Sequence, residues 1–155
     1  MKALKGIDYF YNDTLRNQVI IGSGGLLYAS SGKAENLLEL LCEANGRSLS
    51  GSISLFSKVN RSHQKSGVLV NPNQQEIYFP THAGNNAACI WINYGHINKL
   101  TAAPFNECII HFDSGAMLQV KCSRRVIQRQ MKRCLCVLKS LCNPYEIISE
   151  MVSPI

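Results

Sequence analysis

The stretch from Asn71 to Leu100, NPNQQEIYFPTHAGNNAACIWINYGHINKL, decides how the rest of the chain is organised. It opens on an Asn-Pro-Asn turn signal, and a short apolar strand is predicted from Glu76 to Phe79. Pro80 ends that strand because proline has no N–H to donate to a ladder and fixes its own φ. After the small-residue loop 83–88, Cys-Ile-Trp-Ile at 89–92 predicts a second, largely buried strand that holds the chain's single tryptophan.

The order of residues in and around this stretch resembles a known family. Asn-Pro, Phe-Pro-Thr, Cys-x-Trp-Ile and His-Ile follow one another as in the ComK family of bacterial competence transcription factors. The resemblance runs from about Leu37 to Arg133, whereas the first thirty-odd residues and the tail after Leu141 match poorly. It rests on an ordered set: Cys42, Gly46, Gly51, Asn71-Pro72, Phe79-Pro80-Thr81, Cys89, Trp91-Ile92, His96-Ile97, Gly115 and Gln130.

The resemblance implies a function and partners. ComK-type proteins recognise pairs of short A·T-rich boxes in double-stranded DNA, largely from the minor groove, as dimers or tetramers, and they activate competence genes. The implied partners are therefore A·T-rich DNA, further copies of the same chain, RNA polymerase, and an adaptor of a Clp-type protease. No cofactor is implied, and the protein is not expected to be an enzyme.

Two segments depart from the family pattern. Gly51-Ser52-Ile53 stands where relatives carry Gly-Arg-Lys, and Gly84-Asn85-Asn86 stands where some have an arginine. The lost cations leave open an alternative, a regulatory paralogue that forms heteromers and contacts DNA weakly. Asn85 and Asn86 can still hydrogen-bond phosphates or base edges.

Composition indicates one folded domain over residues 1–155, with 46% hydrophobic and 17% charged residues. The longest uncharged run, 17–32, is shorter than a bilayer crossing and contains Gly22, Gly24 and Gly25. The N-terminus reaches Asp8 before any apolar signal region. We therefore expect a cytoplasmic protein without a membrane partner.

Positive charge gathers in one segment. Between residues 121 and 139 there are seven lysines and arginines and no acid, whereas the other nine lysines and arginines and the ten acids sum to −1, within a total of +6. Surface helices normally interleave acids for i,i+4 pairing, and this segment has none. Such a patch is typical of a polyanion-binding surface.

The pattern along the chain predicts an α+β fold, a single strand-rich domain with antiparallel hairpins, one short helix and a basic C-terminal helix. The predicted hairpins join 18–21 to 26–29 and 107–112 to 116–122, and further strands are expected at 52–59 and 67–70. A helix is predicted at 34–45, and a longer one begins after Ser123 as N-cap and ends near Cys142. Its predicted apolar stripe is Ile127, Met131, Cys134, Leu135, Leu138, Leu141 and Cys142.

No familiar major-groove module is visible. Helix-turn-helix requires two neighbouring short helices, and the predicted helix 34–45 lies far along the chain from the basic one. DNA contacts are therefore assigned to the basic helix, with a polar loop at 58–65 and the loop before Cys89 as secondary contributors. The predicted DNA-binding residues are Arg124, Arg125, Arg129, Lys132, Arg133, Lys58, Arg61, Lys65, Asn85 and Asn86.

The seven cysteines are odd in number and irregularly spaced, so they are interpreted as reduced, mostly core thiols. Cys134, Cys136 and Cys142 lack zinc-knuckle spacing, and Cys108 and His111 fall on opposite strand faces. Pairing of Cys89 or Cys42 with His96 or His82 in catalysis stays open, although no feature marks an activated thiolate. Packing is favoured for Cys89, and a scaffold role for Phe79, Trp91, Ile92 and His96.

Overall fold

The computed structural model describes residues 4–142 and 144–155. The strands are β1 (Tyr9–Asp13), β2 (Gln18–Ser23), β3 (Leu26–Ser31), β4 (Val68–Asn71), β5 (Glu76–Pro80), β6 (Trp91–Asn93), β7 (Ile97–Ala103), β8 (Glu107–Phe112) and β9 (Met117–Val120). The helices are α1 (Ala34–Ala44), α2 (Leu49–Asn60), α3 (Arg124–Cys142) and α4 (Pro144–Met151), with 3₁₀ turns η1 (Pro72–Gln74), η2 (Tyr94–His96) and η3 (Pro104–Asn106).

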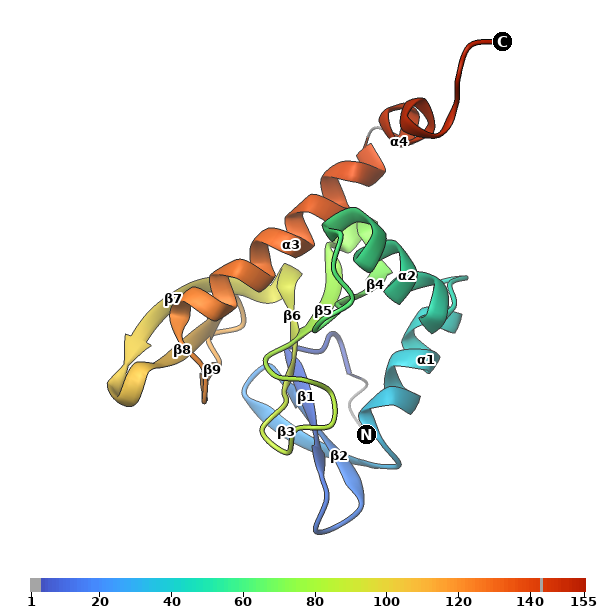
Figure 1. Cartoon of the computed structure of the whole chain (residues 1–155). Coiled ribbons are helices and arrows are strands. Elements are labelled where there is room, and N and C mark those ends of the chain that lie inside the picture. The colour runs from blue at the N-terminus through green and yellow to red at the C-terminus, as the bar shows by residue number, and fades with distance from the viewer. Residues whose placement is uncertain (1–3, 143) are drawn as a thin grey trace.

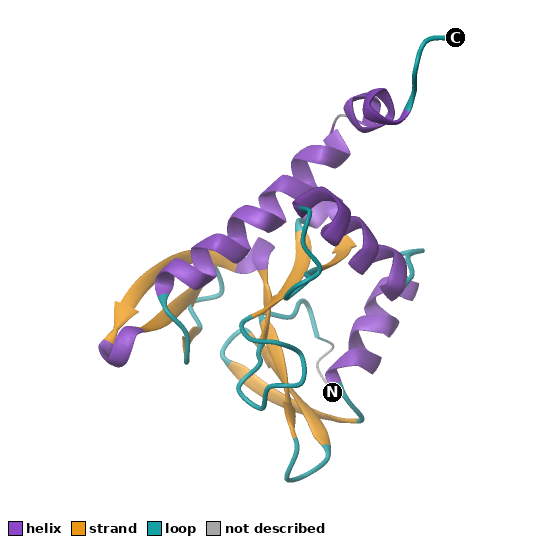
Figure 2. Ribbon diagram, viewed as in Figure 1, coloured by secondary structure: helices purple, strands orange, loops and turns teal. Residues whose placement is uncertain are grey.

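Two antiparallel sheets carry the fold (Figure 1). The larger has the order β3-β2-β1-β6-β5-β4, and the smaller has the order β7-β8-β9. α3 lies along the small sheet and reaches the large one, as Figure 2 shows. The predicted α+β class with antiparallel hairpins is confirmed.

The stretch that organises the sequence also lies at the centre of the large sheet. Asn71 Oδ1 accepts a bond from Asn73 N at 3.1 Å, which closes the predicted turn. β5 then runs between β4 and β6, and Pro80 is its last residue, as expected. Ile77, Tyr78 and Phe79 are all fully buried.

The central strands are buried on both faces because neighbouring side chains point to opposite sides of a sheet. Ile77 and Phe79 enter the core that α3 and the small sheet complete, whereas Tyr78 enters a second core with Phe10 and the buried residues of α1. An uninterrupted apolar run such as IYF is the sequence expected for such a strand. α1 and α3 thus cover opposite faces of the large sheet.

The prediction of a strand at 52–59 was wrong, because this segment is the helix α2. Ser48 Oγ accepts from Gly51 N at 3.0 Å and caps its first turn. Ser52 and Phe56, four residues apart, are buried, whereas Ile53 is 38% exposed. The buried residues of this segment therefore follow helical spacing, and one of them is a serine. The alternation of Ile53 and Leu55 with polar residues, which suggested a strand, does not match the observed burial.

The polar residue at position 52 has a structural task. Ser52 Oγ donates to Leu69 O at 2.8 Å, so α2 covers the outer edge of β4. An uncovered edge strand would expose a row of unpaired backbone groups. One short helix was expected besides the basic helix, but the structure has α2 and α4 in addition to α1.

The other predicted elements are confirmed with shifts at their ends. β2 and β3 form the first hairpin and β8 and β9 the last. α1 ends shortly before Gly46, which has a φ of 70°, and glycine adopts this angle easily because it has no Cβ. Ser123 Oγ accepts from Val126 N at 3.2 Å at the start of α3.

Two details of burial differ from expectation. Leu135 and Cys142 of the predicted apolar stripe are exposed, and Gln130 and Val137 are buried in their place. Trp91 is only half-buried and lines a surface hollow, so it is not a central core residue.

All seven cysteines are free thiols, of which Cys42, Cys89, Cys108 and Cys134 are buried. No helix within the described ranges is long and apolar enough to cross a membrane.

A buried carboxylate joins the two sheets. Asp8 is 3% exposed and accepts from His96 Nδ1 at 2.8 Å, from Ser114 Oγ at 3.0 Å and from Gly24 N at 3.1 Å. These partners lie in η2, the β8–β9 turn and the β2–β3 turn. The scaffold role expected of His96 agrees with this contact.

The pKa values of the pair shift in opposite directions. The hydrogen bond to Asp8 raises the pKa of His96, more than burial lowers it. Burial raises the pKa of Asp8, but its hydrogen bonds from His96, Gly24 and Ser114 together bring it below 3.8. The pair is therefore ionised between the two values, and each partner favours the charged form of the other.

We expect a stability maximum in mildly acidic solution. The Asp8 contribution is present above pH 3.8 and is lost as pH falls through the lowered folded pKa; the His96 contribution is full below pH 6.5 and is lost as pH rises through the raised folded pKa. Urea unfolding at pH 5.5 and 8 should show lower stability at pH 8. His96→Gln should flatten that difference, whereas His63→Gln in the exposed loop should keep it. Equal pH profiles for the wild type and His96→Gln would contradict this account.

Candidate nucleic-acid interface

The cations of α3 face away from the core. Each residue of an α-helix advances about 100° around the axis. Ile127, Gln130, Cys134 and Val137 form the buried side. On this geometry the exposed side chains of Arg125, Arg129 and Lys132 fall on the opposite side, with Arg124 at one flank and Arg133 at the other.

No carboxylate neutralises this face. Among the described residues, the one ion pair is that of His96 with Asp8, and it includes no residue of α3. Arg125 and Arg129 are four residues apart on the exposed side of α3, so their like charges repel. An anion from outside the chain would relieve that repulsion.

The fold brings the polar loop at 61–66 beside this helix. Gln130 Nε2 donates to Lys65 O at 3.1 Å, and Arg133 Nη2 donates to Gln64 O at 2.9 Å. Loop and helix together line a hollow of about 250 Å³ between Lys65, Arg129 and Arg133. Residues more than sixty positions apart in sequence thus share one surface.

The loop adopts an unusual backbone. Arg61 and Lys65 have φ values of 52° and 47°, the left-handed region that non-glycine residues rarely occupy. Each such residue costs about 1 kcal/mol. The carbonyl of Lys65 accepts from both Gln130 and Arg133, and these bonds hold the loop in place.

Arg133 differs from the other arginines because its guanidinium is committed internally. It donates to Lys65 O at 3.2 Å and to Gln130 Oε1 at 2.6 Å, and it lies 5.0 Å from the ring centroid of Phe56. Burial lowers its pKa, and the charge of Arg129 lowers it further. Arg133 therefore fastens α3 to α2 and to the loop, a role that sequence reasoning did not assign to it.

Two further exposed cations, Lys58 and Arg61, lie at the end of α2 and directly after it. They line a second hollow, together with His63, which shares no residue with the hollow at Lys65, Arg129 and Arg133. Asn60 Nδ2 donates to Arg133 O at 3.2 Å, which keeps the end of α2 against α3. We define the cationic surface as the following exposed cations of α2, the loop, β7 and the first half of α3: Lys58, Arg61, Lys65, Lys99, Arg124, Arg125, Arg129 and Lys132.

Lys99 was missed by sequence reasoning. It lies on β7, and it lines a hollow with Arg124, Gln128 and Met131 of α3. The alternation of the small sheet could have identified it. Ile110 and Phe112 are buried on one side of β8, so residues on the other side of the sheet face solvent.

The structure does not place Asn85 and Asn86 on the cationic surface. Both line a separate hollow with Lys33 and Trp91, beside the β1–β2 turn. Asn86 Oδ1 accepts from Ala88 N at 2.8 Å within its own loop. If these amides contact nucleic acid, they do so from a second surface.

Acidic side chains lie on the other face of the large sheet. Glu35, Glu39 and Glu43 recur every four residues and are exposed on α1, which covers the other face of the large sheet from α3. These carboxylates are therefore separated by the sheet from the cations of α3.

α1 is far along the chain from the basic helix α3, as expected, but the unforeseen helix α2 follows α1 after residues 45–48 alone, so α1 and α2 are a second pair to consider as a helix-turn-helix. Charge argues against their use as a DNA reader. The three glutamates of α1 would face phosphates in any approach by that helix.

Cysteine chemistry finds no support in the geometry. Burial raises the pKa of both Cys42 and Cys89, which disfavours the thiolate. The ring of His82 is hydrogen-bonded to Thr81 Oγ1 and Lys121 O, and that of His96 to Asp8. Within the residues that the structure describes, no three histidine, cysteine or acidic side chains gather as a metal site.

Comparison of the sequence with known proteins identifies a family match. Residues 8–143 match the family model described as ComK protein, so the match includes the N-terminal hairpins that residue order alone had left out. The chain is also 24% identical over 101 residues to the competence transcription factor of Bacillus subtilis strain 168. That alignment covers 65% of this chain and 53% of the relative, so the chain spans about half of that protein's length.

No solved structure matches the chain significantly. The family model nevertheless covers most of the sequence, from the first strand of the large sheet to the end of the basic helix α3. The chain belongs to the ComK family.

Proposed function

We propose that this protein is a sequence-specific DNA-binding transcription factor of the competence-activator type. The observation that carries the proposal is the cationic surface, whose cations have no carboxylate partner among the described residues. Phosphate binding releases counterions and would offset the repulsion within α3. Membership of the ComK family supports the same function.

The target we propose is the A·T-rich minor groove, as the family resemblance implies. A narrow A·T-rich groove has an enhanced negative potential that attracts arginine. Arg124, Arg125 and Arg129 are exposed near the start of α3, while the opposite side of that helix is buried. The helix therefore offers one flank to DNA, together with the neighbouring loop. We further propose that copies of the chain bind paired boxes as a homo-oligomer.

The departure at Gly51-Ser52-Ile53 gives less support than expected to the alternative, a regulatory paralogue that forms heteromers and contacts DNA weakly. Ser52 is 3% exposed and its hydroxyl is bonded to Leu69 O. A serine there removes no cation from the surface of this fold, since position 52 faces the edge of β4. The argument for weakened DNA contact then rests on position 53 and on the loop 84–86.

Arg133 and Arg129 should separate stability from binding. Arg133→Ala removes three hydrogen bonds and the contact with Phe56 and should lower the free energy of unfolding by about 2 kcal/mol. Arg129→Ala, at an exposed position, should change it by less than about 0.5 kcal/mol. Urea denaturation of the two variants measures the difference. Similar losses in both would contradict the assignment of Arg133 to the scaffold.

Arg129→Ala should weaken DNA binding and its salt dependence together. Loss of one phosphate contact reduces the slope of log affinity against log salt by about 0.9 and weakens binding several-fold at low salt. Fluorescence anisotropy across a salt series measures both. Arg16→Ala, an exposed cation in the β1–β2 turn, is the matched control and should leave both unchanged. An unchanged slope for Arg129→Ala would remove α3 from the interface.

Groove choice can be tested by moving a single amino group. Guanine differs from adenine in the minor groove by its N2 amino group, and inosine lacks it. We expect an A·T-rich duplex and its I·C counterpart to bind alike, and a G·C duplex to bind at least about tenfold more weakly. Readout from the major groove would instead make the I·C duplex behave like G·C. Equal binding to all three duplexes would contradict sequence recognition.

A further inference from the structure

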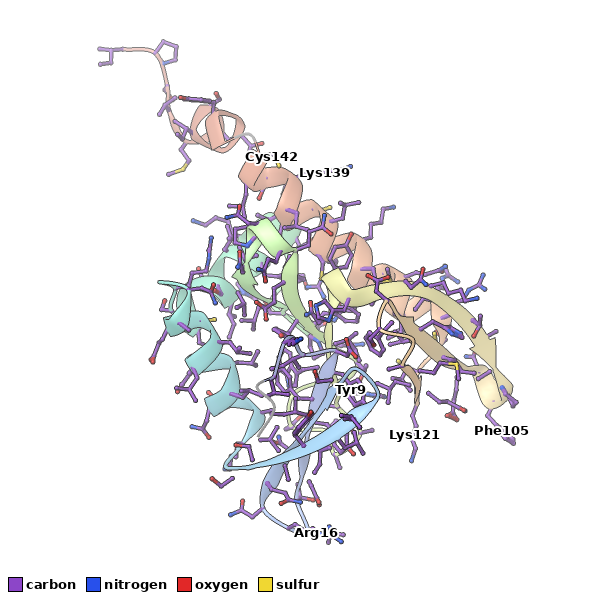
Figure 3. All side chains as sticks on the ribbon, turned by 180° about the vertical axis from the view of Figure 1, so that it is seen from behind. Tyr9, Arg16, Phe105, Lys121, Lys139 and Cys142 are labelled. Atoms are coloured by element: carbon purple, nitrogen blue, oxygen red, sulfur yellow. The ribbon has the colours of Figure 1, made fainter. Side chains whose placement is uncertain are left out.

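An aromatic side chain stands at the far end of the small sheet. Phe105 lies in η3, the connection between β7 and β8, and is 94% exposed. Figure 1 shows this ribbon extending past the first turn of α3, and Figure 3 shows Phe105 at its tip. A phenylalanine held in water contributes nothing to the core of this chain.

The backbone at the tip is strained. Phe105 and Asn106 have φ values of 61° and 55°, both in the left-handed region. Glycine would adopt these angles freely, whereas a residue with a Cβ does so at a cost. Strain of this kind is typical of functional positions, where the surrounding structure holds it in place.

The ribbon behind the tip is well anchored. Ala102 pairs with Cys108 and Ala103 with Glu107, and Cys108 is fully buried beneath α3. Gln119 Nε2 of β9 donates to Glu107 Oε1 at 3.3 Å, so the carboxylate of Glu107, the first residue of β8, is held toward β9. Phe105 is thus presented on a supported two-stranded arm whose last side chains before the proline, two alanines, are small.

Positive charge lies at the base of the same arm. Lys99 of β7 lines a hollow with Arg124, the first residue of α3. Lys99 lies four residues before the end of β7, so the strand rises about 13 Å between these cations and the turn that holds Phe105. A duplex held by the cationic surface would therefore reach an apolar tip at that distance.

We propose that Phe105 is a wedge that inserts from the minor groove between two stacked base pairs of bound DNA. Apolar wedges at minor-groove sites unstack a base step and kink the duplex, and aromatic rings stack on any base. The cations at the base of the arm hold backbone phosphates farther along the duplex from that step. This inference rests on the proposed DNA-binding function and assigns to the tip a contact that the cationic surface does not make.

The test uses the full chain and a duplex with paired A·T boxes that carries 2-aminopurine directly beside the boxes and not within them, because its 2-amino group lies in the minor groove. The fluorescence of this base rises on unstacking. Wild-type protein should raise the fluorescence at one step and bend the duplex in a phased-bend assay. Phe105→Ala should abolish both signals and weaken binding about tenfold, with an unchanged salt slope. Phe105→Trp should keep both signals. Leu15→Ala, which removes a 98% exposed side chain from the β1–β2 turn, is the matched control and should behave as wild type.

The outcomes separate the two proposals. If the wild type fails to bind any duplex, the proposed function fails. If it binds with a salt slope but Phe105→Ala gives the same affinity, fluorescence and bend, the wedge fails alone. Sedimentation of each variant without DNA covers a protein partner: a change of oligomeric state in Phe105→Ala with wild-type fluorescence would assign the tip to an interface between copies and overturn the wedge.

Discussion

The amide of Gln130 is the contact on which the candidate interface depends. It is 2% exposed, and its Nε2 donates to Pro80 O at 2.9 Å and to Lys65 O at 3.1 Å, while its Oε1 accepts from Arg133. One side chain thus joins the end of the central strand β5, the cationic loop and the basic helix. Buried polar groups stabilise a structure when all their partners are present, and this amide has them.

That arrangement explains how a helix without acids can be tolerated. The repulsion along α3 is a local cost, and it is offset by the burial of Ile127, Cys134 and Val137 against both sheets. Arg133 adds to the anchoring because its charge is used internally. The remaining cations stay exposed on a helix that is held firmly on its other side, which is the preorganisation that a phosphate-binding surface requires.

The large-scale charge pattern follows from the two cores. α1 and α3 cover opposite faces of one sheet, so the glutamates of α1 and the arginines of α3 point away from each other. The Asp8 carboxylate then fixes the small sheet to the large one, since it binds η2 and the β8–β9 turn together. Through that link the β7–β8 arm has a defined position beside the start of α3.

Local sequence determined the elements whose signals are local. The turn before β5, the stop at Pro80, the two hairpins, the cap at Ser123 and the acid-free face of α3 all depend on neighbouring residues, and they were predictable. α2 was missed because its buried positions include a serine, which apolar periodicity does not count.

Tertiary structure alone decided which distant residues share a surface. Lys65 and Arg129 line one hollow because Gln130 donates to a loop carbonyl. Arg133 is directed toward Phe56, and Asn85 lies on another surface. Such contacts depend on how helices pack on the sheets, and no pattern confined to a single segment specifies that packing.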